Sequence, residues 1–511
     1  MHAGRSIRKK LKKILGIGGG APDYIRLVSE KTGWTYEEAK KQMDIVSSQL
    51  GIPYDIYYEK EYYALTRSRQ ERRAATSRRL REWKNIISSD ISEKTGKNED
   101  EIIEAIRALN DKAKVGYKVK LLSYNKYGMY EMSEEEALEL IRTLDKLRKR
   151  TSVLKKKLDR IDRGELDYAS IEGDIRRYYR MRKKAITPGL RRYLSSGIAA
   201  IDSSILSDPK RLDNTIADIE ASRMLLGFSM SEYKMYHLNR TTLEEKRAYL
   251  NDNDRKRLIK EINTEATFDM LNNKYALYEK LKDYFGRELY AVNSEEDFEG
   301  FCDYVSRHPV FVCKPLNDSL GRGISLVTIE PGADLRAEFR SLLDEKLTFL
   351  MEERVICDER LAAFNRDSLN TVRLITYYDG EQVSFMGGFL RTGRPGSFVD
   401  NAGAGGIFSS VDCATGRLNS VGGDENGNLY EEHPDSHIRY YGFQLPDWQK
   451  ALELGKKVCE EIGERCIIGW DLALNDRGDW VIIEGNGIPQ FVHQGPLGYG
   501  VKEDFLKVIG A

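Results

Sequence analysis

Two carboxylates and a carboxamide near the C-terminus have the types and spacing of a metal site. Asp471 lies in one apolar run, and Glu484 and Asn486 end the next, with an Asn-Asp-Arg-Gly turn between the runs. This pattern predicts two strands joined as a hairpin. Because side chains alternate along a strand, Glu484 and Asn486 share one face, and Asp471 can lie across from them. Carboxylate and carboxamide oxygens suit Mg²⁺, whereas the alternative of a solvated polar face fits poorly beside the apolar residues 481–483.

A lysine at the end of an apolar run could contact phosphate. Lys314 closes the run 309–315, and a loop with Gly321, Arg322 and Gly323 follows. Small residues let backbone N–H groups approach phosphates closely. The loop is not a Walker A motif, because neither Lys-Ser nor Lys-Thr follows its glycines. The alternative is a hairpin loop with an exposed lysine.

A paired acid and a strand arginine complete the candidate chemistry. Glu352 and Glu353 follow an apolar run, where a backbone segment could bind an adenine edge and a carboxylate an amine or hydroxyl. Arg373 alternates with apolar residues after an Asn370-Thr371 turn. A charge in such a strand must be paired or face a site, and its planar donors suit phosphate or acyl-phosphate oxygens. A structural ion pair is the alternative.

In this order, the motifs resemble the ATP-grasp superfamily over roughly residues 265–500. The Asp, Glu and Asn spacing is similar to that of D-alanine–D-alanine ligases. The segments Leu-Asn-Thr-Val-Arg, 399–406 and Gly-Trp-Asp are most similar to the sugar-transfer associated ATP-grasp subfamily. The resemblance implies an α+β fold with two α+β subdomains that grip ATP, with ATP and Mg²⁺ as cofactors.

The resemblance also assigns roles to residues. It implies that Lys274 and Lys314 contact the phosphates and that Gly321, Arg322 and Gly323 form the flexible lid. It implies that Glu352, Glu353 and Val355 form the adenine hinge. Asp471, Glu484 and Asn486 would then be the Mg²⁺ ligands. One departure concerns the catalytic arginine, which the D-alanine ligases place two residues before the metal Asp. That position is Gly469 here. Arg373 could replace it, and with Lys314 it is the catalytic candidate.

A second set of residues is expected to contact the acceptor. The Gly-rich segment 397–407 lies between predicted strands, and we interpret it as an acceptor loop, with a surface turn as the alternative. Gln490 and His493 follow the metal hairpin and could bind or deprotonate the second substrate. The predicted substrate residues are Asn370, Asp400, Asn401, Gly405, Gln490 and His493.

Three functions remain open at this point. The first is a carboxylate–amine ligase, in which a carboxylate attacks the γ-phosphorus and an amine then attacks the acyl phosphate. Its small-molecule or glycan-linked substrates would belong to cell-surface glycan or precursor modification, by association with the subfamily name. The second is a phosphotransferase on a sugar or polyol hydroxyl, which the missing arginine at position 469 slightly favours. The third is a nucleotide-binding scaffold.

Before about residue 265 the chain is helical, charged and rich in Tyr. Ser-Glu-Lys-Thr-Gly occurs at 29–33 and again at 92–96, and 226–233 is a looser third echo. These repeats could be duplicated scaffold or could hold a partner or acceptor. Apolar spacing over 137–161 and 166–179 predicts a long helical hairpin. Its surplus of Lys and Arg is either a solvated face or a surface for an anionic partner, such as a phosphorylated glycan carrier.

The 511 residues suggest about three domains at ~150 residues each. We expect a basic tail at 1–20 that ends in glycines, duplicated helical, Tyr-rich modules at 21–130, the helical hairpin and third echo at 131–260, and the catalytic domain at 261–511. The tail could be mobile or could form a helix that makes peripheral membrane contact.

Charge and cysteine content limit the partners and the compartment. Lys plus Arg and Asp plus Glu balance at 81 each, so we expect no nucleic-acid partner. The six cysteines show no CxxC spacing, which favours a reduced, cytoplasmic compartment. No apolar stretch approaches the ~20 residues of a membrane helix, and the start lacks a secretory signal.

Overall fold

The computed structural model describes residues 87–316, 324–346, 348–396, 400 and 405–510. The chain divides into two compact units, residues 1–102 with 340–347, and residues 103–339 with 348–511. The described part of the first unit is helical at 87–95, from Glu99, where α6 (Glu99–Ala113) begins, and at 340–346, the end of α18 (Leu335–Lys346). The predicted tail at 1–20 and the first repeat copy at 29–33 lie outside the described residues. The boundaries expected at residues 130 and 260 stay predictions.

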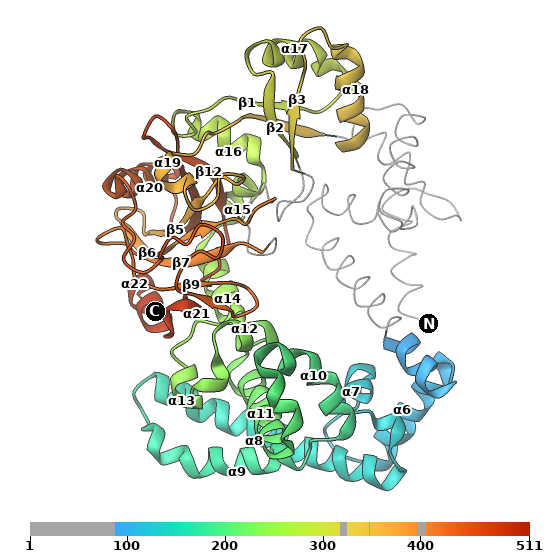
Figure 1. The fold of residues 1–511 in the computed structure, drawn as a ribbon. Helices are drawn as coiled ribbons and strands as arrows, with labels where there is room; N and C mark the ends of the chain where they lie inside the picture. The colour runs from blue at the N-terminus through green and yellow to red at the C-terminus, as the bar shows by residue number, and fades with distance from the viewer. Residues whose placement is uncertain (1–86, 317–323, 347, 397–399, 401–404, 511) are drawn as a thin grey trace. The chain divides into compact units, whose positions relative to one another are not determined.

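Helices make up the described chain before about residue 265, as the sequence predicts, and continue to residue 281, beyond the predicted change (Figure 1). They are α6 (Glu99–Ala113), α7 (Leu121–Lys126), α8 (Glu134–Asp162), α9 (Glu172–Lys183), α10 (Pro188–Asp202), α11 (Pro209–Ala221), α12 (Met230–Met235), α13 (Leu243–Lys246), α14 (Asp252–Ile262), α15 (Glu265–Asn272) and α16 (Lys274–Leu281). The predicted helical hairpin is confirmed as α8 and α9. Ser133 and Glu136 form a capping box at the start of α8. The positive φ of 70° at Gly164 follows its end.

One supersecondary unit occurs twice in this helical region. In the first copy, α7 is followed by Gly128 in the left-handed region, a 3₁₀ turn at Met129–Glu131 and a helix with a capping box. In the second, α12 is followed by left-handed His237, a 3₁₀ turn at Leu238–Arg240 and a second capping box. The sequence echo at 226–233 has its counterpart at 50–57, which lies outside the described residues, so that echo stays a prediction.

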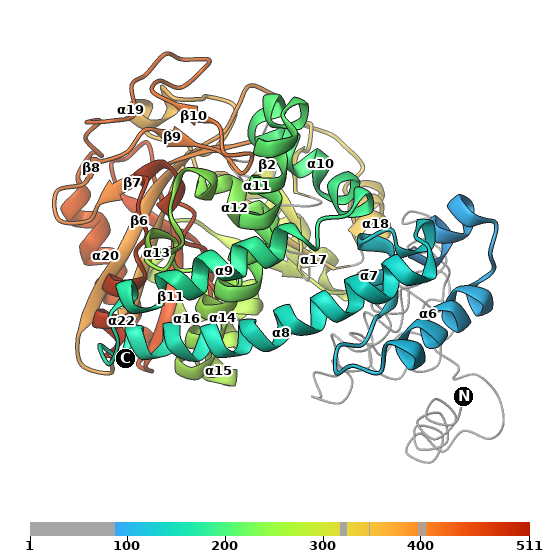
Figure 2. The ribbon, with the colours of Figure 1, turned by 90° about the horizontal axis from the view of Figure 1, so that it is seen from below.

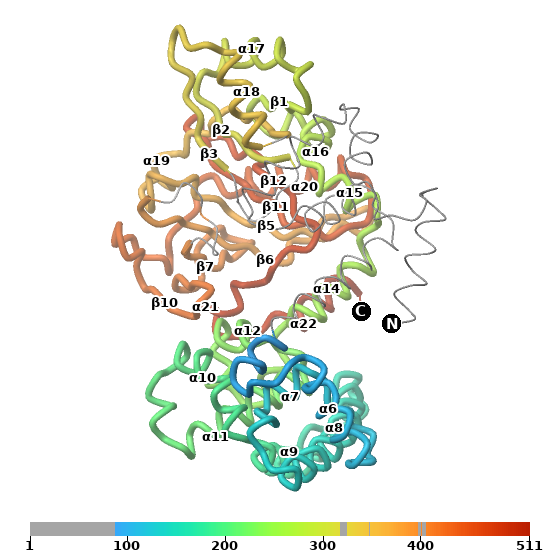
Figure 3. Tube along the Cα trace, turned by 90° about the vertical axis from the view of Figure 1, so that its right-hand side faces the viewer, coloured from blue at the N-terminus to red at the C-terminus, as the bar shows by residue number. Residues whose placement is uncertain are grey.

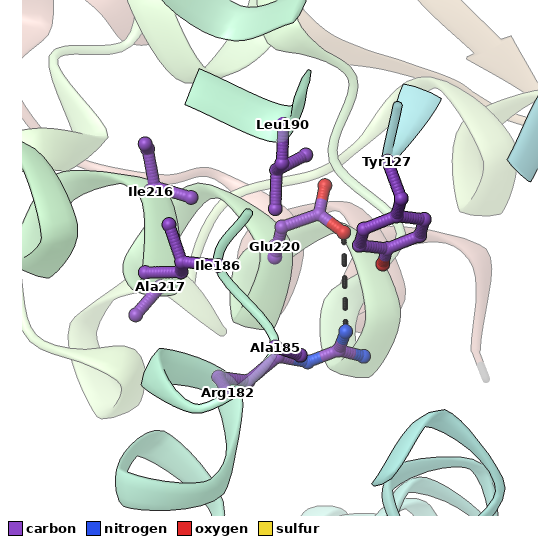
Figure 4. Close-up of a pocket in the computed structure, with 8 residues that line it drawn as sticks. All are labelled: Tyr127, Arg182, Ala185, Ile186, Leu190, Ile216, Ala217 and Glu220. Atoms are coloured by element: carbon purple, nitrogen blue, oxygen red, sulfur yellow. Dashed lines mark ion pairs between the residues drawn. The ribbon is translucent and has the colours of Figure 1, made fainter. Parts of the chain in front are cut away.

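In the helical region, the buried carboxylate of Glu220 pairs with cations from different segments of the chain. Glu220 on α11 has an Oε1 2.7 Å from Nζ of Lys126, and its Oε2 lies 3.0 Å from Nη2 of Arg223 and 3.9 Å from Nη1 of Arg182. Figure 4 shows Glu220 and Arg182 among apolar side chains from neighbouring helices. Burial raises the pKa of Glu220, but Lys126, Arg223 and Arg182 outweigh it and lower the pKa to about 2.

Replacing Glu220 by Gln should lower the free energy of unfolding by about 3 kcal/mol at pH 7. The depressed pKa means that this stabilisation is present above pH 4.5 and is lost as the pH falls towards 2. Urea unfolding with amide hydrogen exchange in α11, at pH 7 and pH 3, measures both effects. Glu261→Gln, on an exposed part of α14, is the control. Equal losses in the two variants would contradict the prediction.

The smaller of two antiparallel sheets has the strand order β1-β4-β2-β3. Its strands are β1 (Leu289–Val292), β2 (Val310–Pro315), β3 (Ser325–Thr328) and β4 (Phe349–Glu353), and the helices beside them in the chain are α17 (Phe298–Arg307) and α18 (Leu335–Lys346). Lys314 is the next-to-last residue of β2 and Glu352 lies on β4, as expected for the predicted strands. This sheet therefore positions the phosphate lysine and the paired acid.

The larger sheet has the order β10-β9-β7-β6-β5-β11-β12, with β8 beside β7, and its central strands are seen side by side in Figure 3. Its strands are β5 (Thr371–Tyr378), β6 (Val383–Thr392), β7 (Ile407–Asp412), β8 (Arg417–Leu418), β9 (Gly422–Gly423), β10 (Leu429–Tyr430), β11 (Cys466–Leu474) and β12 (Trp480–Asn486). The remaining helices are α19 (Glu359–Ala362), α20 (Trp448–Ile462), α21 (Gln494–Leu497) and α22 (Lys502–Ile509). The α+β class is confirmed.

Apolar side chains cover both faces of the larger sheet. One face, with Leu374 and Trp470, packs against α20, and the other, with Ile375 and Ile467, packs against α14 and α22. Among the described residues, no helix has both the length and the apolar character needed to cross a membrane. Because both faces of the sheet are covered by apolar side chains, the polar residues that lie buried within its strands need polar partners.

Candidate active site

Arg373, Asp471 and Glu484 form a row across three strands of the larger sheet. Arg373 on β5 pairs with Asp471 on β11, and Asp471 pairs with Glu484 on β12. Asn486 pairs with Gly469, two positions further along. Directly paired residues of antiparallel strands project to the same face. The predicted hairpin is confirmed, and its three polar residues share a face with Arg373.

A β-bulge in β12 creates this arrangement. Ile482 pairs with Leu472 and Glu484 pairs with Asp471, so that Ile483 has no partner. Ile482 is fully buried in the core that packs on α20. If β12 ran on regularly after Ile482, Ile483 would pair with Asp471 and Glu484 would point to that same apolar face, because side chains alternate along a regular strand. The bulge instead turns Glu484 and Asn486 toward Asp471.

Arg287 holds the bulge in place. Its guanidinium donates to the carbonyl oxygens of Ile482 and Ile483, the latter at 3.2 Å from Nη2. The same Nη2 lies 3.0 Å from Oε2 of Glu352 on β4. The Arg287 side chain is only 2% exposed, so a buried, charge-assisted contact joins the bulge to the smaller sheet.

Asp471 is the centre of a buried charge cluster. Both its oxygens accept from Arg373, at 2.9 Å for Nη2, and its Oδ2 lies 2.7 Å from Nη1 of Arg391. Burial raises the pKa of Asp471, but the two arginines outweigh it and hold the pKa well below its usual range. Asp471 is therefore ionised throughout the physiological pH range.

Glu484 has the opposite environment. Burial and the neighbouring Asp471 carboxylate raise its pKa, although Arg373, Lys314 and Arg391 partly offset this. A cation bound between two facing carboxylates would reduce the repulsion between them and so stabilise the ionised form of Glu484. Among the described residues no group of three His, Cys, Asp or Glu side chains could hold a metal ion. Asp471, Glu484 and Asn486 fit Mg²⁺ only when phosphate oxygens or water complete the oxygen shell.

Position 469 explains the departure from the D-alanine ligase pattern. A Cβ added at Gly469 would lie 2.9 Å from Cδ of Arg373 and 2.5 Å from Cβ of Pro489. The arginine of β5 therefore fills the space that a side chain on β11 would need. This geometry supports the hypothesis that Arg373 replaces the arginine absent at 469.

Sequence reasoning missed Arg391. It lies on β6, contacts Asp471, and makes a second ion pair with Asp400. The other oxygen of Asp400 accepts from the backbone N–H of Thr371 at 3.0 Å and from its hydroxyl. Asp400, predicted to contact the acceptor, thus anchors the segment after β6 to the site. Arg391 is two residues after buried Phe389, and the alternation that singled out Arg373 would also have found it.

The smaller sheet contributes Lys314. Its Nζ lies 2.8 Å from Oε1 of Glu352, whose side chain is 6% exposed between Lys314 and Arg287. Burial raises the pKa of Glu352, but Lys314 and Arg287 lower it overall. Glu352 was predicted to bind adenine, and here both its oxygens are used by protein cations. Glu353 and Val355 are partly exposed at the end of β4.

The turn after Asn486 is fixed by the protein itself. Oδ1 of Asn486 accepts from the N–H of Ile488 at 3.0 Å. Nη1 of Arg255 on α14 donates to the carbonyls of Ile488 and Pro489 at 2.9 and 2.6 Å. Arg255 is 2% exposed. The adjacent Gln490, a predicted substrate residue, is exposed.

The other predicted residues lie in varied surroundings. Asn370 is completely buried, and its amide donates to the carbonyls of Leu361 and Asn365. Lys274 begins α16 and is half-buried, and Gly405 is exposed. Gly321, Arg322, Gly323 and Asn401 lie outside the described residues. The structure brings Arg373, Lys314, Asp471, Glu484, Asn486 and Asp400 together with Arg391.

His493 lies on an aromatic surface rather than in the charge cluster. Its ring stacks on Phe389 at 5.6 Å between centroids and contacts Phe491 at 5.7 Å. Burial lowers its pKa to about 4, so the ring is neutral at pH 7. The predicted role as an acceptor base stays a hypothesis.

A large and a small antiparallel sheet around Lys314, Asp471 and Glu484 have the form of an ATP-grasp protein. The model of the family described as sugar-transfer associated ATP-grasp matches residues 253–509, half of the chain. The chain belongs to this family, as the motifs predicted. No curated protein matches it.

Solved structures provide distant likenesses. D-alanyl-alanine synthetase A from Vibrio cholerae is 14% identical with a TM-score of 0.30, over 49% of this chain and 63% of that one. N5-carboxyaminoimidazole ribonucleotide synthetase from Thermotoga maritima is 13% identical with a TM-score of 0.28, over 47% and 50%. L-amino acid ligase from Bacillus licheniformis is 11% identical with a TM-score of 0.27, over 44% and 42%. The chain thus spans about half of such proteins, and the matches carry no argument about activity.

Proposed function

We propose that this chain is an Mg-ATP-dependent ligase that activates a carboxylate as an acyl phosphate and joins it to an amine. The observation that supports this most is the row Arg373–Asp471–Glu484, with Arg391 and Lys314 beside it. Cations placed around a pair of carboxylates suit a reaction in which phosphate charge is moved. Family membership supports the use of ATP.

In the first step, an oxygen of the substrate carboxylate attacks the γ-phosphorus of ATP and ADP leaves. Lys314 and Arg373 bind the oxygens of the transferred group, and their low exposure strengthens these contacts. Asp471, Glu484 and Asn486 would hold Mg²⁺, which neutralises phosphate charge when bound. Arg391, fixed by Asp400, keeps the Asp471 carboxylate oriented.

In the second step, the amine nitrogen attacks the acyl carbon, the bond from that carbon to the phosphate oxygen breaks, and phosphate leaves with the electrons of the broken bond and takes up the proton that the nitrogen loses. Acyl phosphates hydrolyse, so the amine must react in a site from which water is excluded. The Arg373 and Asp471 side chains, 8% and 3% exposed, meet this need on the larger sheet. Asp400, buried beside Arg391, and the exposed Gly405 are described residues of the Gly-rich segment 397–407, and we assign this segment to acceptor binding.

The family description points to sugar transfer. We therefore propose that the carboxylate or the amine belongs to a glycan or glycan precursor. This part rests on association, because function is carried by the site and not by the fold.

A phosphotransferase is the second candidate, and the geometry of the site weakens the argument for it. The argument for it was the missing arginine before Asp471. Arg373 occupies the space beside Gly469, and Arg391 adds a further cation. The site therefore has the positive charge that an acyl phosphate requires.

Trapping with hydroxylamine tests the ligase. The chain, Mg²⁺, ATP and a pool of sugar acids and amino acids should give a hydroxamate and ADP in equal amounts. Lys314→Met should abolish both, whereas Lys280→Met, at an exposed position of α16, should leave them unchanged. ADP with a stable phosphorylated product and no hydroxamate would instead identify a kinase.

A further inference from the structure

Positive charge is concentrated on α8 and α9. Residues 142–184 contain sixteen Lys and Arg against seven Asp and Glu, whereas the whole chain has 81 of each. The two helices pack side by side through Thr151 and Tyr178, as Figure 2 shows from below. The local surplus therefore belongs to one surface, which we call the α8–α9 basic face.

The cations of α8 follow one side of the helix. The core side carries Leu140, Leu144, Leu147, Leu154 and Leu158, all buried. Arg142, Lys146, Lys149, Lys156 and Arg160 are exposed at steps of four, three, seven and four residues. Such steps place side chains in one row along a helix. At 1.5 Å per residue the row extends for about 27 Å.

The exposed cations of α9 continue this surface. They are Arg176, Arg177, Arg180, Lys183 and Lys184. Nζ of Lys157 on α8 lies 2.5 Å from Oδ2 of Asp174 on α9. Arg177 and Arg150 also act on the same carboxylate and help to lower its pKa. The outward sides of the two helices thus adjoin at Asp174.

Most acidic side chains of this surface are already paired, with Asp159 and Asp167 as the exceptions among the described ion pairs. Asp145 is bound by Arg148 and Lys149, Asp174 by Lys157, and Glu165 by Arg160 and Arg163. Within the described chain, eight cations of residues 142–184 have no ion pair: Arg142, Lys146, Arg150, Lys155, Lys156, Arg180, Lys183 and Lys184. The face therefore keeps a net positive charge after all local pairing.

We propose that the α8–α9 basic face docks this protein on an anionic lipid bilayer. The row of cations is longer than the screening length of ~8 Å at physiological salt, so a single small anion cannot neutralise it. An extended anionic plane can, at about 1 kcal/mol for each Lys or Arg. Val153, 54% exposed within the row, adds an apolar contact. The described residues of the face include no exposed aromatic ring on which nucleic-acid bases could stack.

Vesicle sedimentation with the full chain tests this proposal without any activity assay. The protein should sediment with vesicles of phosphatidylcholine and phosphatidylglycerol, but not with phosphatidylcholine alone, and salt should release it. The variant with Lys146, Lys156, Arg180 and Lys184 all changed to Gln should bind at least about 100-fold more weakly, since each lost charge lowers partitioning about five-fold. A control with Arg257, Lys260, Lys280 and Lys450 changed to Gln, all exposed elsewhere, should bind as wild type.

Several results would overturn the proposal. Equal binding to neutral vesicles would remove its electrostatic basis. Unchanged binding of the α8–α9 variant, together with loss on removal of residues 1–20, would assign the contact to the tail. Binding to a soluble polyanion such as heparin, with none to vesicles, would indicate a polyanionic partner instead. Each outcome is independent of whether the catalytic site makes an acyl phosphate.

Discussion

Asp471→Asn and Glu484→Gln should each reduce hydroxamate formation by about a thousandfold or more, yet shift the stability in opposite directions. The catalytic loss follows from the several kcal/mol that a correctly held metal ion contributes to phosphoryl transfer. Asp471→Asn also leaves Arg373 and Arg391 buried without their shared counterion. Breaking such a pair costs about 3 kcal/mol or more.

Glu484→Gln should raise the free energy of unfolding at neutral pH without Mg²⁺ or nucleotide. The raised pKa of Glu484 means that its ionisation opposes folding above that pKa. A neutral amide removes this cost. Melting temperatures in metal-free buffer, beside initial rates of ADP formation, measure both effects. Asp476→Asn, in the exposed turn between β11 and β12, is the control. Equal destabilisation by both site variants would contradict the charge assignment.

Arg287→Met should weaken the binding of Mg-ATP by at least about a hundredfold, equal to about 2.7 kcal/mol. Arg287 donates to the carbonyls of Ile482 and Ile483, so its loss removes the contacts that hold the bulge. If β12 then paired regularly after Ile482, Glu484 and Asn486 would turn to the apolar face of Ile482 and away from Asp471. Isothermal titration with a non-hydrolysable ATP analogue and Mg²⁺ measures the binding.

Arg257→Met, at an exposed position of α14, should bind the analogue as wild type does. Near-ultraviolet circular dichroism checks that the Arg287→Met variant keeps its tertiary packing. If a folded Arg287→Met variant bound Mg-ATP normally, the bulge that Arg287 holds would not be the feature that orients Glu484.

Patterns within one segment made part of this site predictable. The turn between Asp471 and Glu484 and the alternation around Arg373 are local, and the structure bears out the strands they indicate. The helical hairpin follows from apolar spacing and the glycine at its end. Local hydrogen-bond and burial rules are enough for such elements.

Other features depend on contacts between distant segments. Residues 481–483 are all apolar, so no alternation shows that Ile483 is the bulged one. Arg391 meets Asp471 across 80 positions, and Arg287 meets Glu352 across 65. The pairing of Glu352 with two cations is a property of the packed sheets. A sequence pattern can mark such residues as unusual, but it cannot name their partners.

The contact of Arg255 with the turn after Asn486 has a consequence for how the protein could have been assembled in evolution. Arg255 belongs to α14, in the helical part of the chain, but its hydrogen bonds go to Ile488 and Pro489. A gene fusion that joined a foreign N-terminal region at residue 260 would discard this arginine and leave the buried carbonyl of Pro489 and the part-buried carbonyl of Ile488 without their donor. Exchange of the helical region between relatives is therefore expected at a junction before Asp252, so that α14 is inherited with the catalytic fold.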